Sequence, residues 1–245
     1  MEINKYIDHT NLNAYATKED IKKLCEEAME YGFYSVCVNP YYVSYAKELL
    51  KNSNIEVCTV VGFPLGMNIS NVKEYEAIAA KEDGANEIDM VINIGALKDK
   101  DYDYVKEEIE LIRDAIDGLP LKVIIETCYL TDEEIIKATE ICNETFVNFI
   151  KTSTGFGTRG VSIHDIELIN EYKNELLEIK ASGKIKNINE VNDYINMGVT
   201  RIGTSKSVKI VNCHCGDDCD CDGDCHCDDD CDGDCHCDHC DCEED

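Results

Sequence analysis

The chain of 245 residues has no tryptophan, three prolines and no apolar run long enough to cross a bilayer. We therefore expect no membrane partner. The first residues, Met1–Lys5, also lack the basic start and apolar stretch of a secretory signal. These absences together predict a cytoplasmic protein.

Positive charge is scarce. All 23 lysines and arginines lie in residues 1–212, against 36 of the 51 acidic residues, and residues 213–245 add 15 acids and no base. The net charge of −28 repels phosphate backbones and anionic lipid surfaces, so nucleic acid is not an expected partner. A phosphorylated small molecule would have to be held by local backbone amides and a few lysines.

Cysteine is sparse before residue 213. The five cysteines of this part each lie within an apolar or helical pattern, namely Cys25, Cys37, Cys58, Cys128 and Cys142. Such a pattern is typical of buried free thiols in a reducing compartment and not of a disulfide framework.

Short apolar runs alternate with amphipathic stretches along residues 1–212. The candidate strands are Lys5–His9, Ser35–Val38, Ile55–Val61, Glu87–Ile92, Lys122–Glu126, Phe146–Lys151, Leu177–Lys180 and Thr200–Gly203. Because these runs are largely apolar and do not alternate between apolar and polar residues, both faces of the sheet should be covered. Eight strand–helix units predict an α/β fold, a (β/α)₈ TIM barrel over residues 1–212; a doubly wound sheet of six or seven strands is the alternative.

Capping pairs predict where several helices begin. Such pairs are Thr17 with Asp20, Asn71 with Glu74, Thr131 with Glu134 and Asn187 with Glu190. We expect the second helix to bury a stripe of Val72, Tyr75, Ile78 and Ala79. A further stripe consists of Val105, Ile109, Ile112 and Ile116.

Three charged residues stand out at or near the carboxyl ends of apolar strands, which form the catalytic mouth of a barrel. They are Asp89, Lys151 and Lys180. A lysine that loses its proton, through burial or a second cation, can attack a carbonyl, and a nearby carboxylate can move protons. A buried salt bridge without catalytic function is the alternative, and spacing alone leaves both open.

Seven segments resemble the deoxyribose-phosphate aldolase family from about residue 5 to about residue 211. They are Tyr6–Thr10, Ser35–Pro40, Val60–Gly66, Glu87–Asn93, Lys122–Cys128, Phe149–Phe156 and Glu178–Gly183. The resemblance implies a class I aldolase on a (β/α)₈ barrel, active without a cofactor. It would reversibly cleave 2-deoxy-D-ribose 5-phosphate to D-glyceraldehyde 3-phosphate and acetaldehyde in deoxyribonucleotide catabolism.

The resemblance also implies residue roles. Lys151 would form the Schiff base, Asp89 would relay protons, and Lys180 would perturb the nucleophile and exchange protons. Asp8 and Cys37 would lie near the substrate.

A phosphate site is expected in the loops after the last three strands. Its candidate residues are Thr154, Gly155, Gly183, Lys184, Gly203 and Ser205. Two departures from the family pattern, Lys184 in place of a glycine and Lys206 in the last loop, leave open another Schiff-base aldolase with a different acceptor aldehyde. A homodimer is a further expectation.

Residues 213–245 form a low-complexity acidic tail with 11 of the 16 cysteines and four histidines. One octet occurs twice, at Cys221–Asp228 and Cys231–Asp238. We expect this tail to be disordered without metal and to bind Zn or Cu(I) through soft donors. The candidate ligands are Cys213, Cys215, Cys219, Cys221, Cys225, His226, Cys227, Cys231, Cys235, His236, Cys237, Cys240 and Cys242. A merely solubilising tail, or disulfides, are the alternatives.

Overall fold

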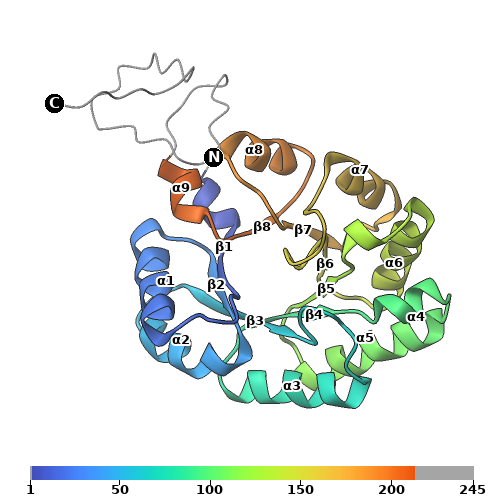
Figure 1. Ribbon diagram of the computed structural model, residues 1–245, viewed down its shortest axis with the longest axis horizontal. Coiled ribbons are helices and arrows are strands. Elements are labelled where there is room, and N and C mark those ends of the chain that lie inside the picture. The colour runs from blue at the N-terminus through green and yellow to red at the C-terminus, as the bar shows by residue number, and fades with distance from the viewer. Residues whose placement is uncertain (1, 213–245) are drawn as a thin grey trace.

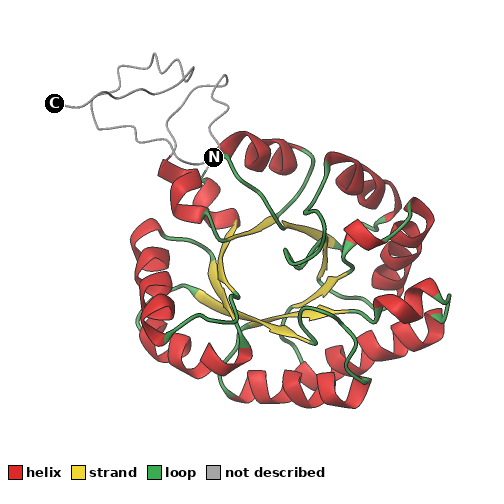
Figure 2. Cartoon of the chain, in the orientation of Figure 1, coloured by secondary structure: helices red, strands yellow, loops and turns green. Residues whose placement is uncertain are grey.

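The computed structural model describes residues 2–212, so the predictions for the acidic tail lie outside the described residues (Figure 1). Eight parallel strands close into a barrel in chain order, and helices surround it (Figure 2). This confirms the predicted TIM barrel and rules out the doubly wound sheet. The strands are β1 (Ile7–Asn11), β2 (Ser35–Val38), β3 (Glu56–Val61), β4 (Glu87–Val91), β5 (Leu121–Ile124), β6 (Phe149–Lys151), β7 (Glu178–Ser182) and β8 (Arg201–Thr204).

Helices follow the strands and form the outer layer. They are α1 (Lys18–Tyr31), α2 (Val43–Leu50), α3 (Ser70–Glu82), α4 (Ile94–Lys98), α5 (Tyr102–Ile116), α6 (Asp132–Glu144), α7 (Ile163–Tyr172), α8 (Ile188–Asn196) and α9 (Ser207–Asn212). Short 3₁₀ turns occupy Ile3–Tyr6, Pro40–Tyr42 and Thr127–Tyr129. Within residues 2–212 no helix has the length and apolar character needed to span a membrane.

Side-chain hydrogen bonds fix several helix starts as the sequence predicts. Thr17 and Thr131 each form a capping box with the residue three positions later, at the starts of α1 and α6. The Asn187 side chain accepts a hydrogen bond from the Glu190 amide at the start of α8. These local bonds satisfy amides that the first helical turn leaves without a partner.

Helix α3 differs from its prediction. It begins at Ser70 after an Ile69 cap without a side-chain hydrogen bond, so Asn71 is not its capping residue. The predicted stripe is also wrong, because Val72 and Tyr75 are 46% and 75% exposed. The helix instead buries the face with Lys73, Ala77 and Ala80.

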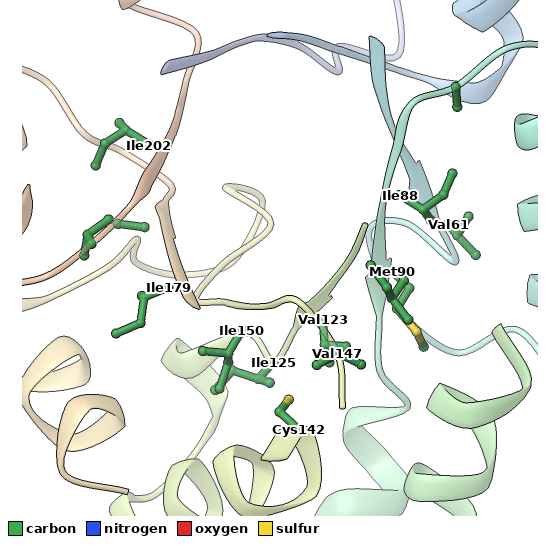
Figure 3. Close-up of a cluster of buried hydrophobic side chains, with 14 of the residues drawn as sticks. Val61, Ile88, Met90, Val123, Ile125, Cys142, Val147, Ile150, Ile179 and Ile202 are labelled. Atoms are coloured by element: carbon green, nitrogen blue, oxygen red, sulfur yellow. The ribbon is translucent and has the colours of Figure 1, made fainter. Parts of the chain in front are cut away.

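Alternate strand residues point to opposite sides of the barrel wall. The outward set packs against helices in one large apolar core, with Ile88, Met90, Val123 and Ile150 between the strands and the helical layer (Figure 3). The α5 stripe predicted from the sequence joins this core. The inward set is mostly polar and charged, and its apolar part includes a small cluster of Leu12, Cys37, Cys58 and Val60. The barrel interior therefore carries the charged groups of the candidate site.

Candidate active site

A pocket of about 450 Å³ opens where the loops after β1, β6, β7 and β8 meet. These loops follow the carboxyl ends of their strands, the end of a barrel where active sites lie. Lys151 lines this pocket. So do all six residues predicted for phosphate binding, Thr154, Gly155, Gly183, Lys184, Gly203 and Ser205, together with Lys186 and Lys206. The fold thus brings the predicted nucleophile and the predicted phosphate loops into one cavity.

The three residues of the predicted catalytic set are in contact beneath this pocket. One oxygen of Asp89, Oδ2, lies 2.8 Å from Lys151 Nζ and 2.7 Å from Lys180 Nζ. Asp89 and Lys180 are fully buried, whereas Lys151 is 3% exposed and lines the pocket. A single carboxylate oxygen therefore joins the two lysines, and of the three residues only Lys151 is open to a substrate.

The other oxygen of Asp89, Oδ1, accepts hydrogen bonds from Lys122 and Cys58. Lys122 Nζ lies 2.9 Å from Oδ1, and the Cys58 thiol donates to the same atom over 3.1 Å. Burial opposes ionisation of Asp89, but Lys122, Lys151 and Lys180 outweigh it and hold its pKa well below its usual value. Asp89 is therefore an oriented carboxylate at neutral pH.

Lys180 has a second carboxylate partner in Asp8, whose other oxygen accepts hydrogen bonds from Arg201 Nη1 over 2.9 Å and from Ser35 over 2.7 Å. Burial disfavours the charged form of Lys180, but Asp8 and Asp89 raise its pKa above the usual value. Lys180 is therefore a cation at neutral pH, and a single atom, Asp89 Oδ2, contacts both its ammonium group and the Lys151 amine.

Asp8 and Cys37 do not line the pocket. Both are fully buried on the inner wall of the barrel, where Asp8 contacts Lys180 and Cys37 lies opposite Cys58 on the neighbouring strand. Their predicted place near the substrate stays a prediction.

Four participants were missed by the sequence reasoning, namely Cys58, Glu87, Lys122 and Arg201. Glu87 lies two residues before Asp89, so the two-residue period of a strand turns both inward. The same alternation would have placed Arg201 on the same side as Gly203. Strand alternation would therefore have indicated both residues. The sequence prediction considered only the carboxyl ends of the strands, whereas Glu87 and Arg201 are the first residues of β4 and β8.

Buried bonds shape the loops that carry the phosphate candidates. Glu126, in the left-handed region at φ 53°, accepts hydrogen bonds from the amide and hydroxyl of Thr154. The Ser182 hydroxyl donates to the Ser153 carbonyl over 2.6 Å, which ties the loop after β7 to the loop after β6. Lys184 adopts φ 57°, a conformation that favours glycine, and its ammonium donates to the Thr158 carbonyl.

Metal chemistry has little support in this part of the chain. Among residues 2–212, the groups close enough to share an ion are Cys37 with Cys58 and Asp89, and Asp8 with Cys58 and Glu87. Lysine and arginine side chains already contact all three of these carboxylates. These ammonium and guanidinium groups fill the place that a metal cation would take.

A (β/α)₈ barrel with a pocket lysine held on a buried carboxylate defines a class of barrel enzymes suited to carbonyl chemistry. The particular family follows from comparison with known proteins: the model of the DeoC/LacD family aldolases matches residues 3–200, and the chain belongs to this family.

Individual relatives agree with the family assignment. Deoxyribose-phosphate aldolase from Thermococcus kodakarensis is 55% identical over 214 residues, covering 86% of this chain and 96% of the relative. The Finegoldia magna enzyme of the same name is 55% identical over 211 residues, covering 86% and 99%. The tetrameric deoxyribose phosphate aldolase structure from Aeropyrum pernix superposes with a TM-score of 0.78 at 29% identity, covering 85% and 89%.

Proposed function

We propose that this protein is a class I aldolase that reversibly cleaves 2-deoxy-D-ribose 5-phosphate to D-glyceraldehyde 3-phosphate and acetaldehyde, in deoxyribonucleotide catabolism. One observation carries the proposal: the Lys151 amine lines the pocket while it contacts a carboxylate oxygen shared with Lys180. The names of the relatives agree with this substrate.

In the cleavage direction, the neutral Lys151 amine adds to the aldehyde carbon of the open-chain sugar, and the carbinolamine loses water to give an iminium ion. Loss of the C3 hydroxyl proton lets the C2–C3 bond break, and its electron pair moves to the iminium nitrogen to form an enamine. Glyceraldehyde 3-phosphate leaves. Protonation of the enamine carbon and hydrolysis then release acetaldehyde and restore the amine.

We assign the proton transfers to Asp89, which contacts both lysines, with Lys180 as the cation beside the nucleophile. No metal or organic cofactor is needed, because the protonated imine itself accepts the electron pair. Asp8 and Cys37 are proposed to support this site from the barrel wall.

Borohydride trapping with acetaldehyde tests the nucleophile. The wild-type protein should gain an ethyl group on Lys151, located by peptide mapping, and Lys151→Ala should lose this adduct and at least about 10³-fold in activity. Lys184→Met is the matched control for adduct formation with acetaldehyde, because Lys184 also lines the pocket but lies outside the carboxylate contacts. An undiminished adduct in Lys151→Ala would refute the assignment.

We further propose that the loops around Gly155, Gly183 and Ser205 bind the substrate phosphate, with Lys184 and Lys206 adding positive charge. Kinetics with deoxyribose 5-phosphate and with unphosphorylated deoxyribose separate this from another acceptor aldehyde. Equal kcat/KM for the two sugars would favour the alternative aldolase.

A separate proposal concerns residues 213–245, whose Cys-His-Cys repeats offer soft donors for Zn or Cu(I). Native mass spectrometry of the reduced protein after zinc or copper(I) exposure should show several retained ions. The aldolase activity should not change on chelation, since the proposed chemistry uses no metal. Absence of retained metal would refute this proposal.

We also propose a cytoplasmic homodimer. The five free thiols before residue 213 suit a reducing compartment. Exposed Ile69, Val72 and Tyr75 lie on one face at the start of α3 and are the surface that a second copy would cover. Tyr75→Glu should shift the mass found by sedimentation to that of the monomer, and cell fractionation tests the compartment.

A further inference from the structure

The charged side chains inside the barrel form a closed circuit of ion pairs. Starting at Asp89 Oδ2, contacts run to Lys180, then Asp8, Arg201, Glu87 and Lys122, and return to Asp89 Oδ1. We call these six residues the ionic ring. They come from β1, β4, β5, β7 and β8, so the circuit links strands across the barrel.

The ring is balanced in charge. It alternates three carboxylates with three cations, and each member contacts the two neighbours of opposite sign. Lys151 joins it at Asp89 Oδ2, which brings four cations to the three carboxylates of the ring. Lys151 is therefore the cation of this group with the fewest carboxylate neighbours, one where the other three have two each.

Arg201 and Glu87 close the ring on the side away from Lys151. Arg201 Nη1 lies 2.9 Å from Asp8 Oδ1 and 2.9 Å from Glu87 Oε2, and the guanidinium stacks 3.5 Å from the centre of the Tyr34 ring. Glu87 Oε2 also lies 2.6 Å from Lys122 Nζ. Neither residue lines the substrate pocket, so any effect on catalysis must pass through the ring.

We propose that Glu87 and Arg201 are positioning residues of the aldolase: by closing the ionic ring they fix Asp89 and Lys180 and set the charge around Lys151. This inference rests on the proposed function, since it assigns them a role in forming the Lys151 imine. If both residues had a purely structural role, their loss would impair folding. It would not shift the pH dependence of imine formation in a direction set by the charge removed.

The ionic ring predicts that loss of Glu87 and loss of Arg201 shift the pH dependence of imine trapping in opposite directions. Glu87→Gln removes a negative charge, disfavours the ammonium form near the ring, and should move the pH midpoint of imine trapping downward. Arg201→Met removes a positive charge and should move it upward, and the two midpoints should differ on the order of one pH unit. Opening the ring at either place leaves every other member with at least one neighbour of opposite charge, for instance Lys122 with Asp89.

Titratable groups outside the ionic ring also lie on the inner wall of the barrel. Besides the ring, the inner faces of β2 and β3 carry Cys37 and Cys58. Burial and the hydrogen bond with Cys37 both raise the pKa of Cys58, whereas that hydrogen bond lowers the pKa of Cys37 against the effect of burial. The variants change neither thiol. Because the adduct is read on Lys151, a shift of opposite sign in Glu87→Gln and Arg201→Met reports the charge around this amine.

The experiment is borohydride trapping with acetaldehyde across a pH series, read as the adduct on Lys151 in the full-length protein. Arg201→Lys keeps the charge and should keep the wild-type midpoint, and Glu87→Gln/Arg201→Met restores the balance and should return to it. The folded fraction of each variant is isolated before trapping, so a lower yield does not disturb the midpoint. Equal midpoints in all variants, or shifts of the same sign, would overturn the inference. Failure of the wild type to form any adduct would instead refute the proposed function.

Discussion

A buried ion pair behind the barrel wall gives the sharpest stability prediction. Lys73 of α3 and Glu108 of α5 are both 0% exposed at the side chain, and Nζ lies 2.9 Å from Oε1. Lys73 also donates to the Val91 carbonyl over 2.8 Å, and Glu108 accepts from the Asn93 amide over 3.1 Å. The pair therefore ties two helices to the carboxyl end of β4, two residues beyond Asp89.

Burial dominates the electrostatics of both partners. It lowers the pKa of Lys73 and raises that of Glu108, in each case against the attraction of the other. Removing one partner leaves the other as an uncompensated buried charge, which typically costs 3–5 kcal/mol. For a domain of this size that corresponds to a loss of roughly 6–20 °C in Tm.

We expect Lys73→Met and Glu108→Leu each to lose stability in this range, measured by urea unfolding with circular dichroism. The double variant Lys73→Met/Glu108→Leu should lose less than the sum, by about 1–3 kcal/mol, because it leaves no unpaired charge. It still removes partners of two backbone groups, so full recovery is not expected. Lys106→Met, which breaks an exposed pair with Glu144, is the control and should change little. Strictly additive losses would refute the reasoning.

Three further predictions follow from burial and close contact. Burial opposes ionisation of Asp8 and Asp89, but their cationic neighbours hold both pKa values below 3.8. Their contribution to stability is therefore present above about pH 4 and is lost as the pH falls below it. A urea midpoint that is flat down to about pH 2 would contradict this. Burial raises the pKa of Cys25 and of Cys142 to about 12, so iodoacetamide at about pH 8 should label Cys128 and spare these two, as peptide mapping can show. Gly160→Ala would place Cβ 1.7 Å from the Gly183 carbonyl oxygen and should weaken both folding and substrate binding in thermal and kinetic assays, whereas Gly95→Ala, on α4, should be tolerated.

The strands were predictable because each is a short apolar run, and the barrel followed from their number and their alternation with helices. Helix α3 shows where a prediction from the local sequence pattern fails. Its apolar residues Val72 and Tyr75 face outward, and its buried face is centred on Lys73, whose partner Glu108 lies on another helix. A hydrophobic stripe cannot reveal a buried charge that is compensated by a residue far away in sequence.

The same limit explains what was found and missed in the site. Lys151, Asp89 and Lys180 were recognised because charged residues near the carboxyl ends of barrel strands point toward the mouth. Glu87 and Arg201 begin their strands, at the end usually associated with stability, although Arg201 is only two ion pairs from Lys180 through Asp8. Alternation along each strand would have predicted that both face inward. It could not have predicted that the stagger of the strands closes their charges into one circuit, because that depends on the register of every strand pair around the barrel.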